Sequence, residues 1–253
     1  MLVFEVAAEQ RFQRSLVEHL KQFSPTHASA LGDGALQQIV ADGTRRAFAY
    51  QLTTRGGVRL FLELMFTVGG HFDSDVQYPW AGEILGTASF DGGIQKADQL
   101  YRAITNYLEE VAGPNRQAAV RALQRAVAKG PGALEPAAPS ASAVLDSLKE
   151  AYPEKCAYVG ERAVKTLIAG ARETAARFGP VSSSNVALFA GLMFDLGHMF
   201  YTDALYPWVS STLNDSAIQD AQARLDLLSS KVLAYREAAL NSLIGGTSDA
   251  GDQ

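Results

Sequence analysis

The chain has 253 residues, of which 47% are hydrophobic and 19% are charged, so it can bury a real core and is not globally disordered. The net charge of −5 and the thin spread of Lys and Arg argue against nucleic-acid binding, because phosphate-binding proteins concentrate basic residues on one face. We expect one large domain or two domains of about 120 residues.

The sequence predicts no signal peptide and no membrane span, which bears on where the protein is located. The first five residues contain neither a basic region nor a long apolar region, so no signal peptide is predicted. The most apolar run, Val186 to Phe200, is shorter than the roughly 20 residues of a membrane span and contains Asp195 and His198. Cys156 is the only cysteine, which excludes an intrachain disulfide, and we expect a buried, inert thiol there. The sequence therefore predicts a soluble, cytoplasmic protein.

A long internal repeat dominates the sequence. The pattern L-M-F-x-x-G-x-x-F-x-x-D-x-x-Y-P-W begins at Leu64 and returns without a gap 128 positions later, at Leu192. Further identities at the same shift extend over most of the chain, among them Pro25 with Pro153 and Gly32 with Gly160. We interpret this as a tandem duplication of one module. The predicted organisation is copy one at residues 1–129, a Gly/Pro/Ala linker at 130–140, and copy two at 141–253.

Each copy begins with two predicted helices. Phe12, Leu16, Leu20 and Phe23 in copy one, like Val144, Leu148 and Tyr152 in copy two, fall at helical spacing. Pro25 and Pro153 should end these first helices, because proline lacks the backbone donor and disfavours a helical residue before it. A second apolar stripe, from Leu31 to Ala47 and from Val159 to Ala175, predicts the second helices.

The third predicted helix, Val58–Phe72 and Val186–Phe200, is apolar nearly all round, which is typical of a central helix. Breaks before it offer N-cap residues, and its Gly69 and Gly197 indicate a close helix–helix contact. A polar connection should follow the Tyr-Pro-Trp corner. A fourth helix is predicted from Ile94 to Val111 and again from Leu225 to Ala239.

After the fourth helix the copies diverge. Residues 115–129 can form a fifth helix whose apolar face contains Val120, Leu123 and Val127. The equivalent end of copy two, Gly245–Gln253, is predicted to be a frayed polar tail. No useful period-two pattern is present. The predicted fold is all-α, with two four- to five-helix modules in a pseudo-twofold bundle.

The residues shared by both copies are assigned a structural role. The rings of the Tyr-Pro-Trp corner should cover the core where the central helix ends, with proline fixing the turn, and the preceding aspartates should accept backbone hydrogen bonds. Tyr and Trp are also common interface anchors, so a binding role is the alternative. The shared signature comprises Gly69, Asp75, Tyr78, Pro79, Trp80, Gly197, Asp203, Tyr206, Pro207 and Trp208.

Ionisable residues that differ between the copies are the candidate binding residues: Glu63, His71, Asp73, Asp195, His198 and Tyr201. The run from His71 to Asp75 could suggest a metal site, but the equivalent positions in copy two are Met199, Tyr201 and Asp203, so two of three ligands are missing. We predict no metal site, no cofactor and no catalytic residues, because phosphate-binding loops, nucleophile elbows, H-E-x-x-H and C-x-x-C are all absent.

A resemblance adds a biological context. The residues Arg11-Phe12, His19-Leu20, Gly57–Phe66, Phe72-Asp73 and Tyr78–Leu85 resemble a group of helical bacterial proteins associated with genes for type VI secretion effectors and their spike proteins. The resemblance covers about residues 1–115 and is looser in copy two, where Gly191 replaces Glu63 and His198 replaces Gly70. It implies an immunity protein or an adaptor in toxin delivery.

The leading hypothesis is a non-enzymatic helical protein that binds another protein, such as a secreted effector toxin or a spike component. An acidic chain could complement a basic toxin surface. One alternative is a metal-dependent helical-bundle enzyme that uses Glu63, His71, Asp195 and His198. A second is a small-ligand or lipid carrier with a cavity between the copies.

Overall fold

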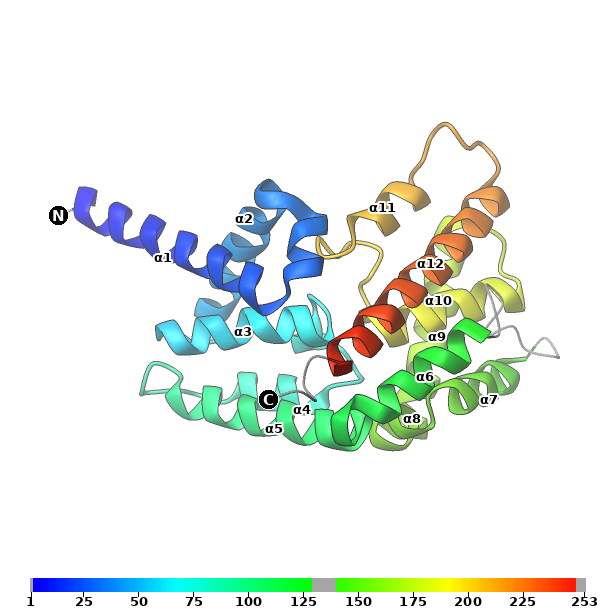
Figure 1. The fold of residues 1–253 in the computed structure, drawn as a ribbon, viewed down its shortest axis with the longest axis horizontal. Helices are drawn as coiled ribbons and strands as arrows, with labels where there is room; N and C mark the ends of the chain where they lie inside the picture. Colours follow the sequence, from blue (N-terminus) through cyan, green and yellow to red (C-terminus); the bar gives the residue numbers. More distant parts are fainter. Residues whose placement is uncertain (1, 129–139, 249–253) are drawn as a thin grey trace. The chain divides into compact units, whose positions relative to one another are not determined.

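The structure is a computed structural model that describes residues 2–128 and 140–248 (Figure 1). These residues form twelve α-helices and two short 3-10 helices with no strand among them, which confirms the predicted all-α class. The chain divides into two compact units. Unit 1 comprises residues 1–104 and 202–207, and unit 2 comprises residues 105–201 and 208–253. The predicted linker lies outside the described residues, except for Ser140.

Unit 1 is built on three helices that pack on one another: α1 (Leu2–Phe23), α2 (Pro25–Ala49) and α3 (Arg55–Val68). They are followed by η1 (Phe72–Ser74), α4 (Pro79–Gly86) and α5 (Ile94–Ala112), whose first half belongs to this unit. The largest fully buried side chains include Leu20, Leu36, Phe61 and Phe72.

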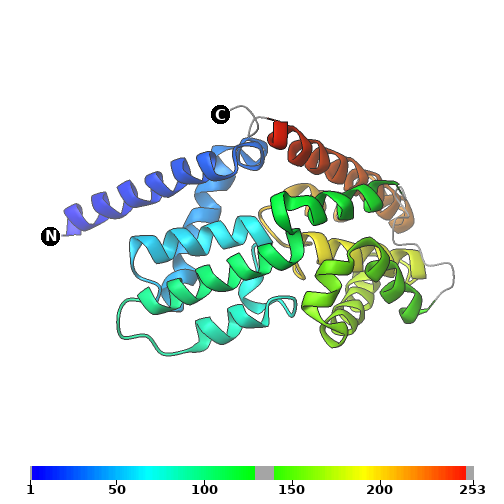
Figure 2. The same cartoon turned by 60° about the horizontal axis from the view of Figure 1, so that its bottom comes forward.

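Unit 2 surrounds one helix, α10 (Ser183–Leu196), which packs against α7 (Ala141–Ala151), α9 (Glu161–Phe178) and α12 (Ala221–Ser248). Ten of the fourteen residues of α10 are buried, so the prediction of a central helix holds for copy two. Only seven of the fourteen residues of α3 are buried. The remaining elements are η2 (Pro114–Arg116), α6 (Gln117–Ala128), α8 (Pro153–Val159) and α11 (Pro207–Leu213). Figures 1 and 2 show α6 alongside α12.

In each copy a glycine ends the third helix earlier than predicted. The backbone of Gly69 has φ 109° and that of Gly197 has φ 101°, and these residues cap α3 and α10. Glycine reaches this region without the steric penalty of a side chain. The predicted extension to Phe72 and Phe200 is therefore wrong, because both phenylalanines lie buried beyond the helix end. The close helix contact inferred for these glycines stays a prediction.

Other helix boundaries also differ from the prediction. The short helices α4 and α11 occupy the expected polar connection, each beginning at the proline of the Tyr-Pro-Trp corner. Helix α12 continues to Ser248, into the predicted frayed tail, of which residues 249–253 lie outside the described part of the chain. Ile94 is 53% exposed instead of lining α5. The predicted fifth helix exists as α6, but its most buried residues are Ala118, Ala122 and Ala126.

Equivalent positions in the two copies adopt the same local structure. Gly32 and Gly160 have φ, ψ of 76°, 163° and 83°, 146°. Thr54 and Ser182 cap α3 and α10, each accepting a 3.1 Å hydrogen bond from the backbone N–H three residues later. The buried ring pairs also agree, because Phe61 and Phe72 lie at an interplanar angle of 55° and their counterparts, Phe189 and Phe200, at 54°.

Candidate functional site

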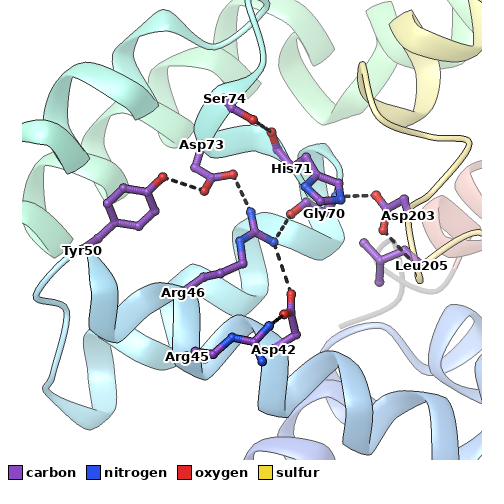
Figure 3. A network of polar contacts seen from close by, with 10 residues as sticks. All are labelled: Asp42, Arg45, Arg46, Tyr50, Gly70, His71, Asp73, Ser74, Asp203 and Leu205. Atoms are coloured by element: carbon purple, nitrogen blue, oxygen red, sulfur yellow. Dashed lines mark hydrogen bonds and ion pairs between the residues drawn. The ribbon is translucent and has the colours of Figure 1, made fainter. Parts of the chain in front are cut away.

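The candidate residue Asp73 lies in a polar network of unit 1 (Figure 3). Arg46, near the end of α2, donates from Nη2 to Asp73 Oδ1 at 2.5 Å, and the Tyr50 hydroxyl donates to Oδ2 at 2.9 Å. The Asp73 side chain is only 8% exposed, so both carboxylate oxygens find partners inside the protein. Burial and the hydrogen bond to Asp73 raise the pKa of Tyr50. The Arg46 guanidinium also lies 5.4 Å from the centre of the Phe61 ring.

The backbone of Gly70 joins this network to residues 202–207 of unit 1. Its carbonyl accepts a 2.7 Å bond from Arg46 Nη1, and its N–H donates to Asp203 Oδ2 at 2.8 Å (Figure 3). A Cβ at this position would lie 2.5 Å from Asp203 Oδ1, which explains the need for glycine. His71 follows in the turn before η1 and is half-buried.

The signature aspartates form the same turn in both copies. Asp75 Oδ1 accepts from the N–H of Gln77, and Asp203 Oδ1 accepts from the N–H of Leu205, each at 2.9 Å. Both aspartates and the tyrosines that follow them are buried, whereas the two tryptophans are half-buried. His27 of unit 1 contacts the turn that follows Asp203: its Nε2 lies 2.8 Å from the Leu205 carbonyl oxygen, and its ring stacks on Tyr206.

The candidate residue Asp195 is held by a buried arginine in unit 2. Arg236 on α12 donates from Nε and Nη2 to Asp195 Oδ2 at 2.9 and 2.7 Å, and its side chain is 5% exposed. Burial opposes the charge of Arg236, but Asp195 more than offsets this, and the pKa of the guanidinium is raised. Burial, reinforced by Asp195, raises the pKa of the neighbouring Tyr152 well above its ordinary value.

The two polar networks occupy different positions of the repeat. The counterparts of Arg46, Tyr50 and Asp73 in copy two are Thr174, Phe178 and Tyr201. There an aromatic contact replaces the ion pair, since the rings of Phe178 and Tyr201 lie 5.8 Å apart. Conversely, the counterparts of Asp195 and Arg236 in copy one are Thr67 and Leu108. Each copy thus holds its helices with a charged pair that the other lacks.

Glu63 belongs to a third group, on the surface of unit 1. Its carboxylate lies 2.7 Å from His19 Nε2 and 3.3 Å from Arg59 Nε, and its side chain is 21% exposed. His198 is half-buried just after α10 in unit 2. Within residues 2–128 and 140–248, no group of three or more His, Cys, Asp or Glu side chains could hold a metal ion.

The structure assigns partners that the sequence reasoning missed. Arg46, Arg236 and Lys96 each hold one or more acceptors inside the protein, and Lys96 donates to the carbonyls of Tyr50 and Leu85 at 2.7 and 2.9 Å. The sequence pattern contains a signal for two of these residues, Lys96 and Arg236. Lys96 precedes Leu100 by one helical turn on the buried stripe of α5, and Arg236 follows Val232 on that of α12. A cation in an apolar stripe requires a buried partner.

Comparisons of the chain with models of protein families, with curated proteins and with solved structures find no match. No described helix combines the length and the apolar character needed to cross a membrane.

Proposed function

We propose that the protein is a non-enzymatic helical module that binds another protein, as an immunity protein or an adaptor for a secreted bacterial effector. The class of partner rests on the resemblance of residues 1–115 to proteins associated with type VI secretion genes. The candidate ionisable residues support a binding protein over an enzyme, because Asp73 and Asp195 are each engaged by an internal arginine and Glu63 by His19 and Arg59.

The observation that carries the proposal is an exposed apolar face on unit 1. Phe90 is fully exposed in the turn before α5, Ile94 is 53% exposed at its start, and Tyr101 is 62% exposed two turns later. Ile94 and Tyr101 are seven residues apart and therefore lie on one side of the helix. Large exposed apolar side chains that share one side of a helix, as Ile94 and Tyr101 do, mark protein-binding surfaces more often than isolated ones do. We call Ile94 and Tyr101 the α5 face.

We also propose that the chain arose by duplication of one helical module. The matching glycine conformations, N-caps and ring pairs of the two copies support this origin. The counterparts of the α5 face are Gln222 and Ser229, so only copy one carries large apolar residues there. The pseudo-twofold arrangement of the modules stays a prediction.

The test is a pull-down from the native host with the intact protein, compared with the Ile94→Glu/Tyr101→Glu variant. We expect capture of a toxin or spike component encoded by a neighbouring gene, and at least a tenfold loss of capture with the variant. Phe48→Glu is the matched control, because Phe48 is 46% exposed on α2 of the same unit. An empty pull-down, or capture that the α5 variant does not reduce, would contradict the proposal. Co-expression with the captured toxin would then separate neutralisation from delivery.

A further inference from the structure

A groove recurs at the same place in both copies. In unit 1 a groove of about 600 Å³ lies between α1 and α2, and in unit 2 one of about 610 Å³ is lined by α7, α9 and the start of α10. Eight of the nine residues that line the first groove have counterparts that line the second, 128 positions later: Gln13, Arg14, Val17, Glu18, Lys21, Asp33, Gln37 and Val40. The groove is therefore a feature of the module.

One end of both grooves is built alike. Lys21 pairs with Asp33 at 3.0 Å in unit 1, and the equivalent Lys149 pairs with Glu161 at 2.7 Å in unit 2. In unit 2 Lys165 also pairs with Glu161, and these two lysines lower the pKa of Glu161 to about 2.

The walls of the two grooves differ in chemistry. In unit 1 glutamines at positions 10, 13 and 37 make the wall polar, and the two cations and two carboxylates of the lining cancel. In unit 2 the floor is apolar and includes Val144, Leu145, Ile168 and Val186, which are buried. Val181, 47% exposed, adds apolar surface at the rim.

The unit 2 groove also carries positive charge in an acidic protein. Its lining holds three cations, Lys149, Lys165 and Arg172, against two carboxylates, so its net charge is +1 while the chain carries −5. Arg172 is exposed and makes no ion pair within the described residues. Ser140 and Ser182, the N-caps of α7 and α10, also line the groove, and helix N-termini favour anions.

We propose that the unit 2 groove binds a small amphipathic anion, with its apolar tail over Leu145 and Ile168 and its carboxylate or phosphate at Arg172 and the two helix N-termini. The lining of α7 extends from Ala141 to Lys149, which corresponds to roughly 12 Å of helix and to the length of a medium-chain acyl group. This site is independent of the α5 face. Loss of one activity leaves the other intact.

The test is calorimetric titration of the full chain with decanoate below its micellar concentration. We expect saturable binding of one molecule per chain, and binding at least tenfold weaker for decanol and for decyltrimethylammonium, which lack the anionic head. Decyl phosphate, titrated in parallel, distinguishes the preferred head group. Absence of saturable decanoate binding, or equal binding of decanol, would overturn the proposal.

The repeat supplies matched variants. Ala141→Gln/Lys165→Gln places two unit 1 residues in the unit 2 groove, which makes its wall more polar and cancels its net positive charge, and we expect at least a tenfold loss of decanoate affinity. The reciprocal change in unit 1, Gln13→Ala/Gln37→Lys, should leave the unit 2 site unaltered. Circular dichroism checks that both variants are folded. Arg172→Glu, at an exposed side chain, should weaken decanoate binding and leave decanol unaffected. Retained binding in the first variant or in Arg172→Glu would overturn the assignment.

Discussion

At the scale of single residues, two arginine–aspartate pairs with little exposure join segments that are distant in sequence. The Arg46–Asp73 and Asp195–Arg236 pairs are both poorly exposed, so each pair stabilises the fold only when both partners are present. Removing one member of a buried pair leaves an uncompensated charge, which costs far more than losing an exposed pair.

Arg236→Met is expected to lower the free energy of unfolding by about 3–5 kcal/mol, because it strands the Asp195 carboxylate. The double variant Asp195→Asn/Arg236→Met should be less destabilised than Arg236→Met alone, since no net charge is then buried. Arg45→Met is the control, at a cost below about 1 kcal/mol, because that side chain is 76% exposed. Urea unfolding measures all three, and equal costs for Arg45 and Arg236 would refute this account.

Gly70→Ala should cost about 1–3 kcal/mol, because the new methyl group meets the Asp203 carboxylate at 2.5 Å and that carboxylate is fixed by two backbone N–H groups. Gly34→Ala, on α2 with nothing within 4 Å of its Cβ, is the matched control. Alanine is the better helix former, so Gly34→Ala should be neutral or stabilising by up to about 1 kcal/mol. Thermal melting of both variants tests the contrast, and equal melting temperatures would count against it.

Cys156 should resist alkylation in the folded protein. Burial raises the pKa of its thiol to about 11, from an ordinary value of 9.0. At pH 8 the folded protein therefore holds almost no thiolate, and iodoacetamide should react many times faster after unfolding in urea. Because the folded thiol keeps its proton where the unfolded one loses it, this group's contribution to stability declines between about pH 9 and pH 11. Equal alkylation rates with and without urea would contradict the burial.

At the scale of elements, periodicity predicted the existence of the long helices better than their ends. The N-cap candidates before α3 and α10 could be recognised because Thr54 and Ser182 precede apolar runs. The ends were missed because Phe72 and Phe200 continue the apolar pattern although Gly69 and Gly197 have already ended the helix. Helices α4 and α11 have only eight and seven residues, too few to display a period. Partners such as Arg46 for Asp73 depend on tertiary packing, which no local pattern encodes.

Lys96 joins three elements, since its ammonium on α5 binds the backbone carbonyls of Tyr50, after α2, and Leu85, in α4. Burial lowers the pKa of Lys96. Lys96→Met should destabilise unit 1 by about 1.5–3 kcal/mol through the loss of charge-assisted hydrogen bonds. Amide exchange should rise in residues 84–96. Gln95→Met, one residue away and exposed, is the control. If it changes amide exchange as much as Lys96→Met does, the hydrogen bonds of Lys96 to the two carbonyls are not responsible for the effect.

At the scale of the whole molecule, the compact units do not follow the order of the repeats. The chain passes from one unit to the other between residues 104 and 105, and again on each side of residues 202–207. Helix α6 is the last helix of copy one in sequence, but it packs on α12 and α7 of unit 2. Copy one therefore completes its own unit only with six residues that copy two provides.

Because residues 202–207 belong to unit 1, we predict that residues 1–128 expressed alone are less stable than unit 1 in the intact chain. The fragment lacks the Asp203 carboxylate on Gly70 and the Leu205 carbonyl at His27, whose loss should cost about 2–4 kcal/mol. The chain has two tryptophans, so Trp80 fluorescence reports unit 1 in the fragment and in the intact Trp208→Phe protein. A peptide spanning residues 199–210 should restore part of the lost stability, and its Asp203→Ala form should not. If fragment and intact protein lose Trp80 structure at the same urea concentration, residues 202–207 contribute nothing to unit 1. In that case each copy would be an autonomous domain.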